Sequence, residues 1–199
     1  MKLGVLLLAL LATACSLAPQ TKPMAVYDFG IDASPSPNAR IAGPLRVAEV
    51  AAPAWLESPA IVYRLAYQDP ARREVYSLSR WAGTPAALLT QRLRARLAAA
   101  TDGGVLTAAE GAKSVYSLNV ELDDFSHVFD ATETSHVLVR ARASLVWTGQ
   151  RALLTQKSFS IEKPAPSANA QGGAHALAQA SDELIDQVVA WVAQSAKGK

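Results

Sequence analysis

The sequence has a single cysteine, Cys15, which excludes an intrachain disulfide and a zinc site built from several cysteines. Charge is also scarce, because 18% of the residues are charged and 19 Lys and Arg against 17 Asp and Glu leave a formal net charge of +2. Such a balance does not attract nucleic acid or an acidic membrane surface through bulk electrostatics. With 199 residues, of which 50% are hydrophobic, the chain can form one compact domain with a sizeable core.

Catalytic and metal-binding motifs are missing as well. His127, His136 and His175 form no H-E-x-x-H or related ligand pattern, and no serine lies in a G-x-S-x-G sequence. The first two histidines are expected at the surface. Gly172-Gly173 lacks the lysine of a phosphate-binding loop, so we interpret it as a loop before a helix. We predict no metal, no cofactor and no enzymatic activity.

What the sequence does have is an apolar run at its N-terminus. Leu3 to Leu11 is interrupted only by Gly4 and follows Lys2. As a helix it would rise about 14 Å, roughly half the hydrocarbon thickness of a bilayer. A short apolar run between a positive start and small residues is typical of a cleaved export signal, so we predict that residues 1–14 are a signal peptide that is removed.

Cys15 directly follows this signal. The run Leu11-Ala12-Thr13-Ala14-Cys15 resembles the bacterial lipoprotein signal, in which cleavage falls just before a cysteine that then carries acyl chains such as palmitate. Two or more chains give a stable membrane anchor. Ser16 after the cysteine, by resemblance to bacterial sorting rules, favours the outer membrane. The alternative is ordinary cleavage that releases a soluble protein.

The mature chain divides into a tether and one domain. Residues 15–24 are polar, contain Pro19 and Pro23 and show no hydrophobic periodicity, which predicts a lipidated tether. The globular domain is predicted at 25–199.

Hydrophobic periodicity predicts strands and two helices within this domain. Thr84-Pro85 and Gly103-Gly104 bracket the first helix, and apolar residues at helical spacing predict the second over 174–193. Without a continuous βαβ rhythm, the pattern indicates a single compact α+β domain, with a mixed or mainly antiparallel β-sheet and two main helices packed on it. The expected strands are 26–31, 45–51, a hairpin of 61–67 with 74–79, then 116–123, 137–147 and 152–161.

Arginines in the first predicted helix and in one of the long strands have predicted roles. Arg92, Arg94 and Arg96 fall mainly outside the apolar face of the first helix, which favours a solvated surface. Docking to lipid headgroups or to an acidic partner stays the alternative. In the long strands, opposite charges are expected to meet across the ladder. The expected pairs join Arg140 and Arg142 to Glu121 and Asp123.

A pattern of aromatic and apolar residues carries a resemblance to a known family. The quoted residues are Tyr27-Asp28-Phe29, Trp55-Leu56, Pro59, Ile61-Val62-Tyr63-Arg64, Trp81, Thr84-Pro85, Leu88-Leu89 and Leu93. From about Tyr27 to the C-terminal helix, the chain resembles the ABC-type transport auxiliary lipoprotein component family, which includes the PqiC-like lipoproteins. The resemblance implies a mixed α/β sheet fold without enzymatic activity.

The same resemblance implies partners and a location. It implies an outer-membrane lipoprotein that faces the periplasm and joins a mammalian cell entry (MCE) protein and an ABC transporter, which move lipids between the two membranes. The expected function is to anchor or dock the MCE protein at the outer membrane. The alternative is a lipoprotein for envelope maintenance or outer-membrane assembly that acts through another protein. Both a monomer and a homo-oligomer stay open.

Five residues are candidates for partner contact. Trp55 and Leu56 lie in a proline-flanked segment between strands, where an exposed aromatic side chain can anchor a partner. Tyr63, Arg64 and Trp81 complete the set. The competing interpretation is that the aromatic residues belong to the core.

Overall fold

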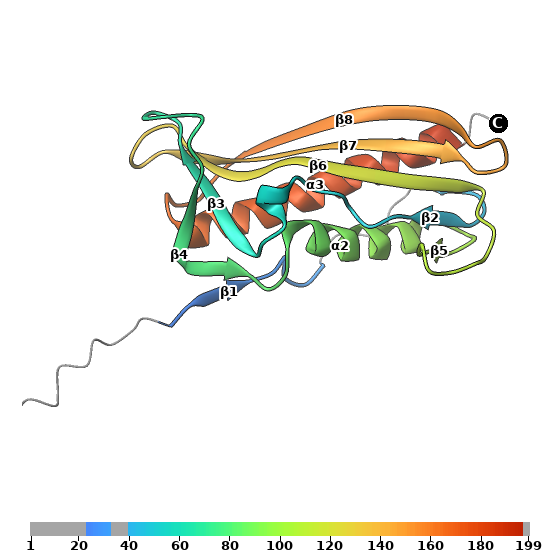
Figure 1. Cartoon of the computed structure of the whole chain (residues 1–199), viewed down its shortest axis with the longest axis horizontal. Helices are drawn as coiled ribbons and strands as arrows, with labels where there is room; N and C mark the ends of the chain where they lie inside the picture. The colour runs from blue at the N-terminus through green and yellow to red at the C-terminus, as the bar shows by residue number, and fades with distance from the viewer. Residues whose placement is uncertain (1–22, 33–39, 197–199) are drawn as a thin grey trace, which may run out of the picture.

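The computed structural model describes residues 23–32 and 40–196. The predicted signal peptide, Cys15 and most of the tether therefore lie outside the described residues. Two helices pack on a mixed eight-stranded sheet, which confirms the predicted α+β fold (Figure 1). The elements are β1 Ala25–Tyr27, β2 Leu45–Val47, the 3-10 helix η2 Ala54–Leu56, β3 Ala60–Leu65, β4 Glu74–Trp81, α2 Pro85–Ala100, β5 Val105–Leu106, β6 Tyr116–Phe129, β7 Ser135–Trp147, β8 Ala152–Pro164 and α3 Ala170–Ala196.

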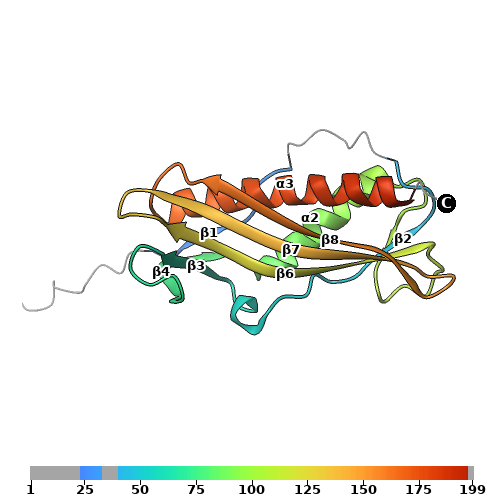
Figure 2. The ribbon, with the colours of Figure 1, turned by 90° about the horizontal axis from the view of Figure 1, so that it is seen from above.

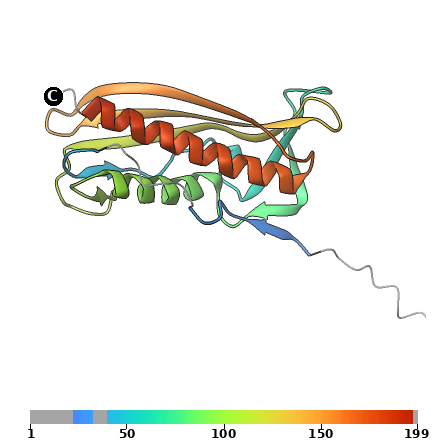
Figure 3. The same cartoon turned by 180° about the vertical axis from the view of Figure 1, so that it is seen from behind.

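Both helices cover the same face of the sheet (Figures 2 and 3). Long α3 lies along β6, β7 and β8, and α2 packs beside α3. The core fills the space between the two layers. Fully buried side chains there include Leu97, Leu118, Leu145, Leu177 and Ile185. This leaves the opposite face of the long strands uncovered by helices.

Strand β6 organises the sheet because each of its edges is paired. One edge is antiparallel to β7, which is in turn antiparallel to β8. The other edge is shared, since β2 pairs in parallel with the start of β6 and β3 pairs in parallel with its end. The β3–β4 hairpin was predicted and is present, and β1 adds to β4 in parallel as the edge strand.

A β-bulge interrupts the register of β6. Leu122 pairs with Ala141 and Asp124 pairs with Arg140, so Asp123 is the extra residue. An extra residue reverses which face the following side chains occupy. Before the bulge, even-numbered residues such as Leu122 are buried, whereas after it the buried Phe125 is odd-numbered.

The bulge also decides which predicted cross-strand pairs form. Glu121 pairs with Arg142 in the ladder and forms an ion pair with it, as predicted. Arg140 instead lies opposite Asp124, and its Nε donates to the Ser160 hydroxyl at 3.4 Å. The predicted pairing of Arg140 with Asp123 was therefore wrong, because the bulge removes Asp123 from the ladder.

Helix α2 begins where the sequence predicted. The Thr84 hydroxyl accepts a hydrogen bond from the Ala87 N–H at 3.2 Å, and Pro85 occupies the first turn, where no donor is lost. The helix ends at Ala100. Beyond it, a Cβ at Gly103 would stand 2.1 Å from the Gly43 carbonyl carbon, so only glycine fits this close crossing of two chain segments.

Helix α3 begins at Ala170, which places Gly172 and Gly173 inside its first turns. The prediction of a glycine loop before the helix was therefore wrong. The Asn169 side-chain oxygen accepts from the Gly172 N–H at 2.9 Å and caps the helix. A Cβ at Gly172 would meet the Ser167 carbonyl oxygen at 2.2 Å. Gly172 is thus explained by the close packing of the helix start against the segment that precedes it.

Candidate functional site

The candidate contact residues of the sequence occupy different environments. Leu56 and Trp81 are both 1% exposed and belong to the core. Trp81 makes edge-to-face contacts with Phe29 and Phe125, each at 5.7 Å between ring centroids. Two of the five candidates therefore offer almost no surface, and partner contact through the set stays a prediction.

Trp55 and Arg64 lie together on the sheet face that the helices leave uncovered. Trp55, on η2, is partly buried. The centroid of its ring is 4.2 Å from the Cζ atom of Arg73 and 5.9 Å from the Cζ atom of Arg64. Arg64 donates to an Asp124 carboxylate oxygen at 2.8 Å, and both side chains are largely buried. Two cations therefore lie near the aromatic ring, which stays partly exposed to solvent.

Beside Trp55 the surface forms a cleft of about 330 Å³, which we call the Trp55 cleft. Its lining residues are Ala51, Ala52, Pro53, Trp55, Glu121, Leu122 and Asp123. One wall is apolar and aromatic, and the other carries two carboxylates around the β6 bulge. Such a cleft suits a side chain with an apolar stem and a cationic tip, as an inserted Lys or Arg would supply.

Tyr63 belongs to an aromatic cluster on the helix side of the sheet. Its ring is 4.6 Å from that of Tyr76 and 5.9 Å from that of Phe129. Behind it lies His127, which the sequence analysis placed in a surface loop but which is 0% exposed and sits in β6. That expectation was wrong because the bulge turns His127 toward α3.

Two hydroxyl groups hold the buried histidine. The Tyr76 hydroxyl is 2.9 Å from His127 Nδ1, and the Ser135 hydroxyl is 2.8 Å from His127 Nε2. Burial lowers the pKa of His127 from 6.5 to about 4, and the charge of His136 adds to this. Burial also raises the pKa of Tyr76. The group is therefore neutral at physiological pH, and its hydrogen bonds are satisfied within the protein.

Arg92 and Arg96 contradict the expectation of a solvated helix surface, since they are 9% and 4% exposed. They lie one turn apart on α2 and face Asp182 and Asp186, which lie one turn apart on α3. Arg92 Nη1 is 3.2 Å from the Asp182 carboxylate, and Arg96 forms an ion pair with Asp186. Two matched ion pairs therefore join the helices.

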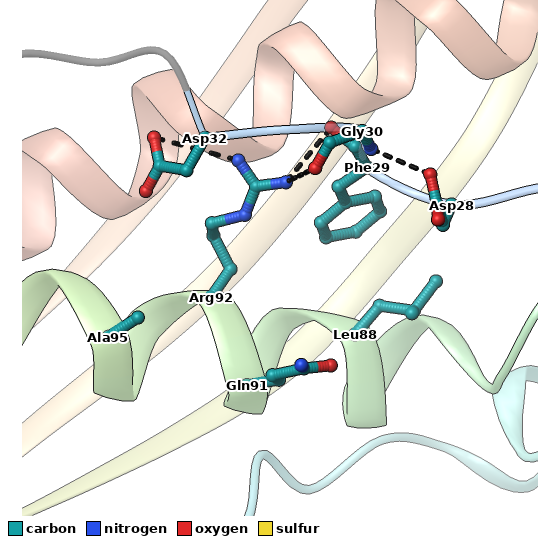
Figure 4. Close-up of a pocket in the computed structure, with 8 residues that line it drawn as sticks. All are labelled: Asp28, Phe29, Gly30, Asp32, Leu88, Gln91, Arg92 and Ala95. Atoms are coloured by element: carbon teal, nitrogen blue, oxygen red, sulfur yellow. Dashed lines mark hydrogen bonds and ion pairs between the residues drawn. The ribbon is translucent and has the colours of Figure 1, made fainter.

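Arg92 and Arg96 also hold residues 28–32, the segment that follows β1, in an arrangement we call the strap clasp; Figure 4 shows the part made by Arg92. Arg92 Nη2 donates to the Phe29 and Gly30 carbonyl oxygens at 2.9 and 2.6 Å. Arg96 Nε donates to Asp32 at 2.6 Å. Through these bonds, residues 28–32 are fixed to α2.

Electrostatics in the strap clasp favour the charged form of Arg96. Burial alone would lower the pKa of Arg96, but its hydrogen bond with Asp32 and the charges of Asp186 and Asp182 raise it. A cavity of about 240 Å³ lies beside the clasp (Figure 4). Because both terminal nitrogens of Arg92 already bind protein oxygens, this cavity is poorly suited to an anionic ligand.

Residues 23–32 and 40–196 hold no group of three or more His, Cys, Asp or Glu side chains that could bind a metal ion. The helices of this part of the chain include none that is both long enough and apolar enough to cross a bilayer.

Solved structures with the same fold support the architecture. Protein XCC0632 from Xanthomonas campestris, whose crystal structure is assigned to the DUF330 family, is 18% identical, with a TM-score of 0.76 over 87% of this chain and 97% of that chain. An uncharacterised protein is 20% identical, with a TM-score of 0.66 over 86% and 99%. Protein CT253 from Chlamydia trachomatis is 9% identical, with a TM-score of 0.54 over 79% and 99%.

Comparison at the level of sequence assigns the family. No curated protein matches the chain significantly. Residues 27–189, which run from β1 into the C-terminal part of α3, match the family described as ABC-type transport auxiliary lipoprotein component. The resemblance predicted from Trp55, Trp81 and the α2 start is thereby confirmed. The chain belongs to the ABC-type transport auxiliary lipoprotein component family.

Proposed function

We propose that the protein is a non-catalytic outer-membrane lipoprotein that anchors or docks a periplasmic MCE protein of an ABC-type lipid transport system. The observation that carries the proposal is the family match over residues 27–189, in a chain that also has a lipoprotein-type signal ending at Cys15. In this proposal, acyl chains on Cys15 hold the protein at the outer membrane, and the folded domain faces the periplasm.

The Trp55 cleft is the proposed contact with the MCE protein. It combines a partly exposed aromatic ring with the carboxylates Glu121 and Asp123. Aromatic residues in partly closed pockets contribute disproportionately to binding, and neighbouring charges select the partner. Partner binding at this cleft requires no catalytic group.

Capture of the native complex tests the proposal. Membranes are extracted in mild detergent, the protein is isolated through a C-terminal tag, and the bound proteins are identified by mass spectrometry. An MCE protein and ABC transporter subunits are expected. A preparation that repeatedly contains the lipoprotein without an MCE protein would contradict the proposal.

The alternative is a lipoprotein of envelope maintenance or outer-membrane assembly that acts through a different protein. Capture distinguishes the two, because an outer-membrane assembly component would replace the MCE protein. The genomic neighbourhood gives an independent indication, since adjacent reading frames for an ATPase, a permease and an MCE protein favour the lipid transport system. The size of the captured complex also decides whether the protein acts as a monomer or as a homo-oligomer.

A further inference from the structure

Exposed apolar side chains gather at one end of the molecule. Within the described residues, eight large hydrophobic side chains are exposed, and half of them lie on β4, on β1 or just before β1. They are Met24, Val26, Val75 and Leu78, with exposed fractions of 52%, 54%, 56% and 48%. We call the surface formed by these four residues and Arg80 the β1–β4 face.

These side chains share one face of the sheet. Val26 pairs with Arg80 in the parallel register of β1 and β4, so both side chains point to the same side. Leu78 precedes Arg80 by two residues and shares that side. The irregular β3–β4 register between Ala60 and Val62 reverses the alternation within β4, so Val75, the neighbour of inward-facing Tyr76, also points outward. By contrast, Tyr76 contacts buried His127 and Trp81 lies in the core. The β1–β4 face is therefore turned away from the helices.

The chain leads from this edge toward the predicted anchor. From Cys15 to Met24 it advances nine residues, which span at most about 32 Å when fully extended. The present inference rests on the acylation of Cys15 in the proposed function. A tether of this length keeps β1 close to the membrane that receives the acyl chains.

The length of α3 gives the distance from β1 to the opposite end of the domain. Near its start, the His175 ring is 6.4 Å from the Tyr27 ring of β1, and at its end the Ala196 carbonyl accepts from the Tyr116 hydroxyl at 3.2 Å. Between His175 and Ala196 the helix rises about 32 Å. The end with the β7–β8 turn is thus as far from β1 as a fully extended tether reaches (Figure 1).

The chemistry of the β1–β4 face fits a phospholipid surface. Aliphatic side chains partition into the boundary between headgroups and acyl chains, and an arginine beside them binds lipid phosphates. Between Val75 and Trp81, β4 carries no acidic residue that would repel those phosphates. We propose that the β1–β4 face rests on the phospholipid surface of the membrane that holds the acyl anchor.

Depth measurements on the full lipoprotein test this contact. The native cysteine is blocked by acylation in the proposed function, so Leu78→Cys and Leu153→Cys each introduce one labelling site. Leu153 is a matched control because it is 59% exposed and lies next to the β7–β8 turn. Each variant is labelled with the environment-sensitive dye NBD and reconstituted in vesicles of phosphatidylethanolamine and phosphatidylglycerol.

We expect blue-shifted emission at residue 78, and several-fold stronger quenching by nitroxide-bearing lipids there than at residue 153. Adding Val26→Ser to the Leu78→Cys protein should reduce the quenching, while circular dichroism confirms an unchanged fold. Water-like emission and equal quenching at both positions would overturn the inference. So would protection of residue 78 that arises only after an MCE protein is added, because the partner would then be the occupant.

Failure of this inference is distinguishable from failure of the proposed function. Intact mass of the same preparation reports whether Cys15 is acylated, and an unmodified cysteine overturns both. An acylated protein that captures an MCE protein but leaves residue 78 in water overturns the membrane contact alone. Strong quenching at residue 78 without an MCE partner supports the contact and contradicts the docking function.

Discussion

Gly173 of α3 lies so close to His127 of β6 that a Cβ on the glycine would stand 2.4 Å from the imidazole Nδ1. That nitrogen is the one that meets the Tyr76 hydroxyl. The close approach of helix and strand therefore depends on a residue without a side chain. It explains why a residue of low helix propensity occurs in the first turns of the longest helix.

Gly173→Ala is expected to destabilise the protein. Alanine favours the helix by up to about 1 kcal/mol, but overpacking against a buried ring costs about 1–3 kcal/mol, so a net loss of about 1–2 kcal/mol is expected. Urea unfolding measures the difference. Gly111→Ala is the control, because a Cβ there meets no atom within 4 Å. Equal stability of the two variants would contradict the role of the close approach.

His127 is expected to make stability fall in mild acid. Its pKa is about 4 in the folded state and 6.5 as an ordinary group, so between these values only the unfolded chain takes up the proton. The contribution is complete above pH 6.5, decreases as the pH falls toward 4 and amounts to about 3 kcal/mol. His127→Gln, which retains two hydrogen-bonding groups, should flatten this part of the pH profile of urea unfolding. An unchanged profile would show that other groups cause the dependence.

Arg92→Ala should loosen the strap clasp. The substitution removes the nearer of the two arginines beside Asp182 and leaves the carbonyls of Phe29 and Gly30 without their donor, and removal of one partner from a largely buried pair costs about 3–5 kcal/mol. We expect the lower part of this range, because Asp182 is 28% exposed. Hydrogen exchange of residues 28–32 should rise together with the loss of stability.

Arg142→Ala is the matched control for the strap clasp. This arginine pairs with Glu121 on the open face of the sheet, where both side chains are well exposed, and exposed pairs contribute little. Little change in unfolding and no change in exchange of residues 28–32 are expected. If both variants lost the same stability, burial of the clasp would not be the cause.

Cys15→Ala should separate anchoring from folding. The variant should no longer fractionate with the outer membrane, whereas its thermal unfolding should match that of the wild type because the first strand, β1, begins ten residues later, at Ala25. Intact mass of the wild-type protein should equal residues 15–199 plus acyl chains. Ser16→Ala is the control and should stay membrane-bound. Release of the wild type by an alkaline wash would contradict acylation.

Substitutions in the Trp55 cleft should weaken partner capture. Asp123→Lys reverses a charge at the exposed bulge without altering the core, and Trp55→Ala removes the aromatic wall. Both should reduce recovery of the MCE protein, Asp123→Lys at unchanged thermal stability. For the tryptophan variant we expect a loss of about tenfold or more in affinity, together with some loss of stability because its ring packs partly against the core. Leu153→Ala, at the far end, should capture normally. Normal capture by both cleft variants would place the contact elsewhere.

The sequence correctly predicted those structural features that depend on a single strand or helix. Alternation from Tyr116 to Leu122 predicted a strand, and Thr84-Pro85 predicted the start of α2, because side-chain period and capping are local properties. The register of β6 and β7 was predicted only as far as Glu121 and Arg142. Beyond Asp123 it depends on a bulge, which alternation alone does not reveal.

The buried polar groups were missed because they depend on tertiary contacts. Arg92 and Arg96 looked solvated when α2 was considered alone, and only α3 supplies their carboxylates. A signal was present, since each helix carries two like charges four residues apart and the two pairs have opposite sign. His127 had no comparable signal, because its burial follows from a change of face within β6.

The extra residue Asp123 shifts the in–out alternation of side chains along β6 by one position. Phe125, His127 and Phe129 face the interior only because the parity has been switched once. Deleting that single aspartate would remove the bulge and leave these side chains on the same face, opposite the same residues of β7. Forcing Asp123 into the ladder would instead turn the aromatic end of the strand toward the open face of the sheet.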